Sequence, residues 1–146
     1  MSTTRTFGTQ LIGQTEKALN SILDRELAGT GLTEPQWVTL TIAVMSGGTI
    51  DPASYVGRVA DALKISPAQA RAQIDELAAA ELVEVSEHGS PVRVADTGSR
   101  LHGRIRAAVT EITGRLWGDL PTDDLATAGR VLGTVLERAN AELART

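Results

Sequence analysis

Apolar residues recur at steps of three and four along several long stretches of the chain. The first stretch covers residues 7–27, and its apolar positions are Leu11, Ile12, Leu19, Ile22, Leu23 and Leu27. Two further stretches, at 96–117 and 125–143, repeat the same spacing. Because side chains three and four residues apart share one face of a helix, the pattern predicts a long amphipathic helix at each of these places.

Between these helices, three short segments each begin with a signal for helix initiation. Residues 33–36 are Thr-Glu-Pro-Gln, residues 51–52 are Asp-Pro, and residues 66–69 are Ser-Pro-Ala-Gln. A Ser, Thr or Asp can cap a helix, proline suits its first turn, and a glutamine three residues after the cap completes a capping box. The apolar run at 37–45 is rich in β-branched residues and would also suit a strand, but the cap favours a buried helix that ends near Met45.

Lys64 and Ile65 alone separate the second of these short helices from the third, which predicts a helix-turn-helix. Residues 82–85 then alternate apolar and acidic side chains, residues 86–91 suit a turn around His88, and residues 92–94 alternate again. That sequence of patterns predicts a β-hairpin. A helix-turn-helix followed by a hairpin is a winged helix.

The long helices at the two ends of the chain carry more apolar surface than one small winged helix can cover. A second copy of the chain is the simplest cover, since most soluble oligomers are symmetric dimers. The expected fold class is therefore mainly α with a small β-hairpin wing: a winged helix-turn-helix flanked by N- and C-terminal dimerisation helices.

The composition narrows the possible functions. The chain has 146 residues, 42% hydrophobic and 3% aromatic, which suits one globular domain with an aliphatic core. It has no cysteine, no apolar run long enough to span a membrane and no signal-peptide pattern at its start, so we expect a cytoplasmic protein with no membrane partner. Its two histidines lack a carboxylate at metal-ligand spacing, and no phosphate-binding loop or nucleophile motif is present. We therefore expect no enzymatic activity, no metal and no cofactor.

Three segments together resemble the MarR family of bacterial transcription regulators. They are "GLTEPQWVTL", "YVGRVADALKISPAQARAQIDELAAAELVEV" and "VRVADTGSRL", and the resemblance spans nearly the whole chain. Leu77, Leu82, Val83 and Gly98 fall on positions typical of the family, whereas Glu81 stands where the family usually has glycine. The resemblance implies a homodimeric winged-helix regulator that binds a pseudo-palindromic operator in double-stranded DNA. It also implies that a small lipophilic or phenolic effector releases the DNA.

The resemblance also implies a division of the chain. Residues 1–146 would form a single MarR-like domain, in which residues 33–96 are the winged helix-turn-helix and residues 5–30 and 97–146 are the dimerisation helices. The recognition helix would begin at the cap at Ser66.

The DNA-binding residues expected from this resemblance are Ser66, Pro67, Ala68, Gln69, Arg71, Ala72 and Gln73 on the recognition helix, with Arg93 on the wing. Arg71 is the leading candidate for base readout, because an arginine can contact guanine O6 and N7 together. Gln69 or Gln73 can pair with adenine, but Gln73 lies closer to the buried side. Arg93 can contact a phosphate or the minor groove; the alternative is a strand residue paired with Glu84 or Glu87.

The expected effector pocket comprises Trp37, Met45 and Tyr55, because ligand pockets favour aromatic walls and Trp37 lies on the helix that borders the family's effector site. Packing in the core is the alternative role for these side chains.

The charge balance favours a second hypothesis. The net charge is −4, and residues 58–106 hold seven basic and seven acidic side chains, which is few cations for a DNA-binding surface. The alternative to the regulator is therefore a winged-helix protein with weakened DNA binding that acts as a protein-interaction module.

Overall fold

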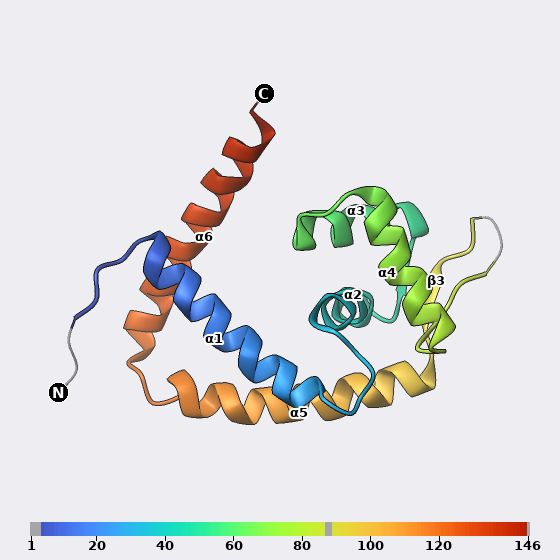
Figure 1. Ribbon diagram of the computed structural model, residues 1–146, viewed down its shortest axis with the longest axis horizontal. Helices are drawn as coiled ribbons and strands as arrows, with labels where there is room; N and C mark the ends of the chain where they lie inside the picture. The colour runs from blue at the N-terminus through green and yellow to red at the C-terminus, as the bar shows by residue number, and fades with distance from the viewer. Residues whose placement is uncertain (1–3, 87–88, 146) are drawn as a thin grey trace. The chain divides into compact units, whose positions relative to one another are not determined.

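The computed structural model of the chain describes residues 4–86 and 89–145. In chain order these residues form α1 (Thr9–Leu27), α2 (Glu34–Met45), β1 (Thr49–Ile50), α3 (Pro52–Leu63), α4 (Pro67–Ala79), β2 (Val83–Glu84), β3 (Val92–Val94), α5 (Asp96–Trp117) and α6 (Thr122–Ala144) (Figure 1). The three long helices, the three short helices and the hairpin are thereby confirmed. Among the described residues, no helix is both long and apolar enough to cross a membrane.

Local hydrogen bonds explain where the short helices begin. Thr33 and Ser66 each close a capping box with the glutamine three residues later, and the Asp51 carboxylate accepts the backbone N–H of Ser54. These contacts satisfy N–H groups that have no partner inside a helix. All three predicted caps are confirmed, and the cap at Thr33 explains why the β-branched run after it is a helix.

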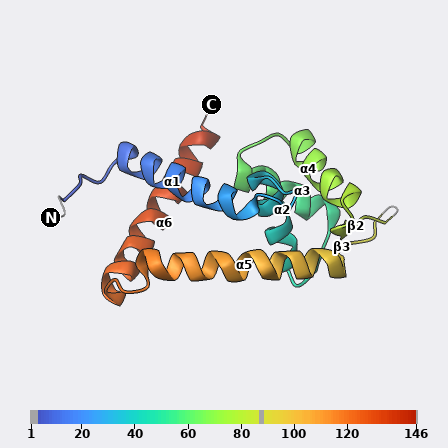
Figure 2. The same ribbon diagram turned by 60° about the horizontal axis from the view of Figure 1, so that its bottom comes forward.

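The turn between α3 and α4 is tight because Lys64 adopts a left-handed conformation with φ of 57°. This conformation ends α3, and Ser66 then starts α4 two residues later. Helices α2, α3 and α4 pack on one another beside the hairpin (Figures 1 and 2). The helix-turn-helix and the wing therefore share one core.

The wing is a three-stranded antiparallel sheet in the order β1-β3-β2. Strand β3 pairs with β2 through Val83–Val94 and Glu84–Arg93, and with β1 through Thr49–Arg93 and Ile50–Val92. The backbone N–H of Val94 also donates to the Gly48 carbonyl at 2.8 Å. Strand β1 is absent from the sequence prediction, because two residues are too few to show an alternating pattern.

The core lies between the three short helices, the sheet and α5. Tyr55, Leu40 and Leu77 are fully buried, and the Tyr55 hydroxyl donates to the Thr39 carbonyl at 2.6 Å. At the start of α5, Gly98 passes so close to the backbone of Leu82 that a Cβ atom would overlap it. This glycine lets α5 pack against the base of the wing.

The chain divides into two compact units, residues 1–109 and 110–146. The first unit contains the winged helix, α1 and the first part of α5, whose Ile105 belongs to the core. In the second unit, α6 has no buried residue. Its exposed apolar side chains are Leu125, Val131, Leu132, Val135, Leu136 and Leu143.

Candidate nucleic-acid interface

The start of α4 is an exposed helix end with a fixed hydrogen-bond pattern. The Ser66 Oγ accepts the Gln69 backbone N–H at 3.1 Å, and the Gln69 Oε1 accepts the Ser66 backbone N–H at 2.9 Å. Pro67 has no N–H, so the N–H of Ala68 is the next donor available to a ligand at this end. The exposed residues of the first turns are Ser66, Pro67, Ala68, Gln69, Arg71 and Ala72.

Arg71 extends from this surface without a partner. Its side chain is exposed and makes no hydrogen bond or ion pair with any residue that the structure describes. A guanidinium is a planar set of donors that matches the two acceptors of a guanine edge. Asp75 and Glu76 are exposed in the following turn, so the cationic part of α4 is confined to its start.

Gln73 lies deeper than Gln69. Its side chain is half-buried, and its Oε1 is buried without a hydrogen-bond partner among the described residues. Its position towards the core agrees with the helical spacing in the sequence.

On the wing, Arg93 pairs with Glu84. The two residues are cross-strand neighbours, and the Arg93 Nη2 lies 3.1 Å from the Glu84 Oε2. Both side chains are more than half exposed, so this pair contributes little to stability and can exchange for a phosphate. Of the two expected partners, Glu84 is the one observed; Glu87 and the turn residue His88 lie outside the described residues.

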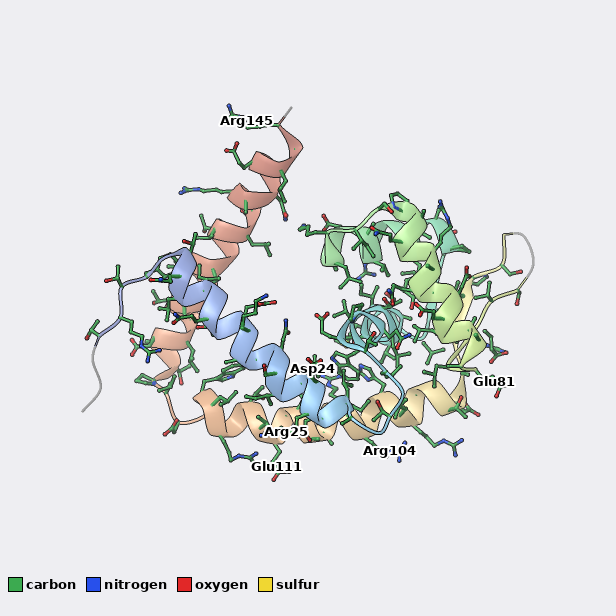
Figure 3. All side chains as sticks on the ribbon, viewed as in Figure 1. Asp24, Arg25, Glu81, Arg104, Glu111 and Arg145 are labelled. Atoms are coloured by element: carbon green, nitrogen blue, oxygen red, sulfur yellow. The ribbon has the colours of Figure 1, made fainter. Side chains whose placement is uncertain are left out.

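Glu81 joins α4 to the wing in a conformation that suits glycine. Figure 3 labels Glu81 where α4 ends. Its φ is 63°, in the left-handed region, and its carbonyl accepts the Thr97 hydroxyl at 2.7 Å. A side chain in this region costs roughly 1–2 kcal/mol. The geometry explains why a glycine is favoured here and shows that glutamate is accommodated in the same turn.

The three residues expected to line an effector pocket have different surroundings. Trp37 stacks on His102 with ring centroids 4.6 Å apart and planes 15° apart. Tyr55 is fully buried with its hydroxyl bonded, so it packs in the core, which was its alternative role. Met45 is 60% exposed, and its sulfur lies 3.7 Å from Arg106 Nη1.

His102 connects α5 to α2. It is buried, and its Nε2 shares a hydrogen bond of 3.1 Å with the Thr41 hydroxyl. Burial, and secondarily the charge of Arg106, lower the pKa of His102. The lowered pKa favours the neutral imidazole at pH 7.

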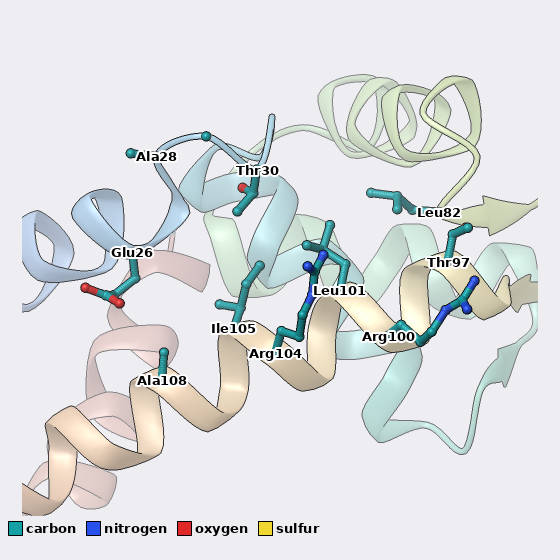
Figure 4. A pocket seen from close by; sticks show the side chains of 11 residues that line it. Glu26, Ala28, Thr30, Leu82, Thr97, Arg100, Leu101, Arg104, Ile105 and Ala108 are labelled. Carbon is teal, nitrogen blue, oxygen red and sulfur yellow. The ribbon is translucent and has the colours of Figure 1, made fainter.

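A groove of about 900 Å³ lies between the residues that follow α1 and the first part of α5 (Figure 4). Its apolar floor includes Leu82, Leu101 and Ile105, and Arg100 and Arg104 extend from α5 along it. Neither guanidinium makes an ion pair or hydrogen bond within the described parts of the chain. This groove was not predicted from the sequence, where its one local signal is the spacing of four between the two arginines, which places them on one helix face.

No protein-family model and no curated protein sequence matches the chain. Solved structures do match over nearly its whole length. A MarR family transcriptional regulator from Silicibacter pomeroyi DSS shares 21% identity over 92% of this chain and 90% of its own, with a TM-score of 0.75. The MarR protein from Peptoclostridium difficile DA00132 shares 16% identity over 97% of both chains, with a TM-score of 0.74. This chain has the MarR fold.

Another protein of the MarR fold is CouR from Rhodococcus jostii RHA1, whose structure is a complex with p-coumaroyl-CoA. It shares 20% identity over 86% of this chain and 88% of its own, with a TM-score of 0.71. The winged-helix architecture predicted from the sequence is thereby confirmed.

Proposed function

We propose that the chain is a transcription regulator that represses by binding a pseudo-palindromic operator as a homodimer. The exposed start of α4, with the unpaired guanidinium of Arg71, is the observation that carries the proposal. In a helix-turn-helix, the second helix enters the major groove with its N-terminal residues at the base edges. Ser66–Gln73 would then contact bases and phosphates, and Arg93 would approach the backbone from the wing.

The electrostatics set the expected strength of binding. The balance of seven basic and seven acidic residues over 58–106 gives little attraction to DNA overall, so affinity depends on a few localised contacts. A dimer doubles these contacts, and backbone N–H groups at the start of α4 add phosphate contacts without charge. We therefore expect modest affinity with a shallow dependence on salt.

The homodimer is supported by the second unit. An apolar stripe along α6 that leaves Leu132, Val135 and Leu136 exposed resembles a helix face that packs on another helix. A second copy of α6 is the expected cover, and the two α4 helices of such a dimer would enter successive major grooves.

We further propose that an amphipathic anion is the effector, and that it binds the groove beside Arg100 and Arg104. An apolar floor with two unpaired guanidinium groups suits an aromatic or aliphatic carboxylate or an acyl thioester that carries phosphates. The ligand of CouR is of this kind. The groove borders the base of the wing at Leu82, so a bound ligand can alter how the wing meets DNA.

Selection of bound sequences from random duplexes, at two salt concentrations, tests the proposal. We expect a palindromic motif with half-sites about one helical turn apart. The variant Arg71→Ala should relax one base position in each half-site and weaken binding by about tenfold. Arg71→Lys is the matched control, because it keeps the positive charge and the salt dependence but loses the bidentate contact with guanine. It should relax the same base position with a smaller loss of affinity.

Failure to enrich any motif at the lower salt concentration would overturn the regulator and favour the alternative, a winged-helix module that binds other proteins. An unchanged motif with Arg71→Ala would remove this arginine from base readout. For the effector, p-coumaroyl-CoA and p-coumarate are suitable probes, and loss of binding in the double variant Arg100→Ala, Arg104→Ala would support the groove.

A further inference from the structure

We infer that the groove-facing start of α4 contacts bases through hydrogen-bond donors alone, and that Gln69 donates to guanine rather than pairing with adenine. The inference rests on the proposed DNA-binding function. It identifies which base edges the helix accepts, because the four base pairs differ in the donors and acceptors that they present in the major groove.

The first observation is that the Gln69 side chain takes part in the N-terminal cap of α4. Its Oε1 accepts the Ser66 backbone N–H at 2.9 Å. Because a backbone N–H can only donate, chemistry fixes this atom as the oxygen and leaves the Nε2 as the free end of the amide. The readout of adenine by glutamine needs both ends: the oxygen accepts from N6 while the nitrogen donates to N7. The cap holds the oxygen against the Ser66 N–H, so the end of the Gln69 amide that is free to reach a base is the Nε2, which can only donate.

The second observation concerns the other glutamine expected at this surface. The Gln73 Oε1 is buried, so it cannot accept a hydrogen from a base in the groove. The Gln73 oxygen is buried, and the Gln69 oxygen is held by the cap. Neither glutamine presents a free amide whose oxygen and nitrogen can both turn to adenine, as its readout requires.

The remaining groups in the first turns are donors. Arg71 has only N–H groups, and Ala68 has a backbone N–H at a helix start, where no intrahelical acceptor exists. The Ser66 Oγ already accepts the Gln69 N–H at 3.1 Å and retains its own hydrogen for donation. Asp75 and Glu76 are the next acceptors along the helix and lie beyond the groove-facing start. Guanine presents two acceptors, O6 and N7, and is the base edge that this set of donors matches.

Opening the capping box would free the Gln69 oxygen but would not favour adenine by much. The helix would lose its N-terminal cap, and the stabilisation that a cap provides is similar in size to the discrimination gained from one adenine pair. The closed box is also present twice in this fold, at Thr33–Gln36 and at Ser66–Gln69. The second copy provides a control.

Base analogues in the selected operator test the inference directly. Replacing adenines one at a time with purine removes the N6 amino group, and we expect affinity to stay within about twofold at every position facing α4. Replacing guanine with 7-deazaguanine removes the N7 acceptor, and we expect about a tenfold loss at one or more positions in each half-site. A tenfold loss on replacing an adenine by purine within the α4 contacts would overturn the inference.

The variant Gln69→Glu isolates this residue. It keeps an oxygen for the Ser66 N–H and so preserves the cap, but it exchanges the donor for a second acceptor. We expect the selected base at one position of each half-site to change from guanine to cytosine, whose N4 amino group donates. The experiment records which base is selected, so a general loss of affinity caused by the added negative charge would not produce the expected change from guanine to cytosine.

Gln36→Glu in the other capping box adds the same charge and should leave the selected motif unchanged. An unchanged motif with Gln69→Glu would overturn the inference while leaving the regulator intact. If the unmodified chain enriches no motif, the proposed function and this inference fail together. Failure of the inference alone is therefore distinguishable from failure of the proposed function.

Discussion

Replacement of Gly98 by alanine tests how the wing and α5 are joined. Gly98 is the third residue of α5 and is buried, and its Cα lies beside the backbone of Leu82. A Cβ atom there would lie far inside van der Waals contact with the carbonyl oxygen of Leu82. That oxygen also accepts the backbone N–H of Ala95 at 3.0 Å, so both partners are fixed main chain and neither can rotate away.

The expected size of the effect follows from three contributions. Overpacking a close-packed site costs roughly 1–3 kcal/mol, and weakening the backbone hydrogen bond to Leu82 costs about 1 kcal/mol. The better helix propensity of alanine offsets at most about 1 kcal/mol. We therefore expect Gly98→Ala to lower the free energy of unfolding by about 2 kcal/mol.

Gly103 provides the matched control on the same helix. A Cβ at Gly103 meets no atom within 4 Å, so Gly103→Ala should gain the propensity term alone and stabilise by roughly 0.5–1 kcal/mol. Urea unfolding followed by tryptophan fluorescence measures both variants, at one protein concentration because self-association shifts apparent stability. In thermal unfolding at the same protein concentration, the loss in Gly98→Ala should appear as a fall in Tm of about 6 °C.

Opposite signs for the two alanine variants are the critical result. Equal stability of Gly98→Ala and the unmodified chain would refute the close approach of α5 to the wing. Shifts of the same sign in both variants would show that propensity, and not packing, dominates at the start of α5.

Two further predictions concern buried polar groups. The pKa of His102 is lowered from 6.5 in the folded chain. As the pH decreases, the unfolded chain therefore binds a proton at this histidine before the folded chain does, so the free energy of unfolding should be greatest above pH 6.5 and fall below it. Urea unfolding at about pH 5.5 and pH 7.5 measures this dependence. The variant His102→Gln can retain the contact with Thr41 and should show a smaller pH dependence. An equal pH dependence in the variant would show that His102 is not its source. Tyr55→Phe removes the hydroxyl that donates to the Thr39 carbonyl, which keeps its place in the hydrogen-bond ladder of α2, so we expect a loss of about 1 kcal/mol by the same assay. An unchanged unfolding midpoint would show that this hydrogen bond contributes nothing net.

The features that the sequence predicted well are local ones. The caps at Thr33, Asp51 and Ser66 lie within a few residues of their partners, so their spacing alone locates the helix starts. The amphipathic stripes likewise need only a helical period. Together these signals sufficed for the order of elements and for the winged-helix class.

Other features depend on contacts between distant residues, and the sequence did not show them. Strand β1 exists because Ile50 pairs with Val92, and the groove exists because α5 passes beside the residues that follow α1. The pairing of Arg93 with Glu84 was one of several alternatives, since the choice depends on the register of the hairpin. For Gln69, the residue type suggested adenine, but only the atomic contact with Ser66 shows that its oxygen is already occupied.

Strand β1, the third strand of the wing, connects the hairpin directly to α2 within the first unit. Helix α2 ends at Met45, and the chain then turns through Gly47 and Gly48 directly into β1, whose partner β3 also bonds to Gly48. The near end of the hairpin is thus fastened to α2, while the opposite end of α2 carries Trp37 against His102. Because β1 follows α2 so closely and pairs with β3, any tilt of α2 on α5 would be passed to the base of the hairpin through this short connection.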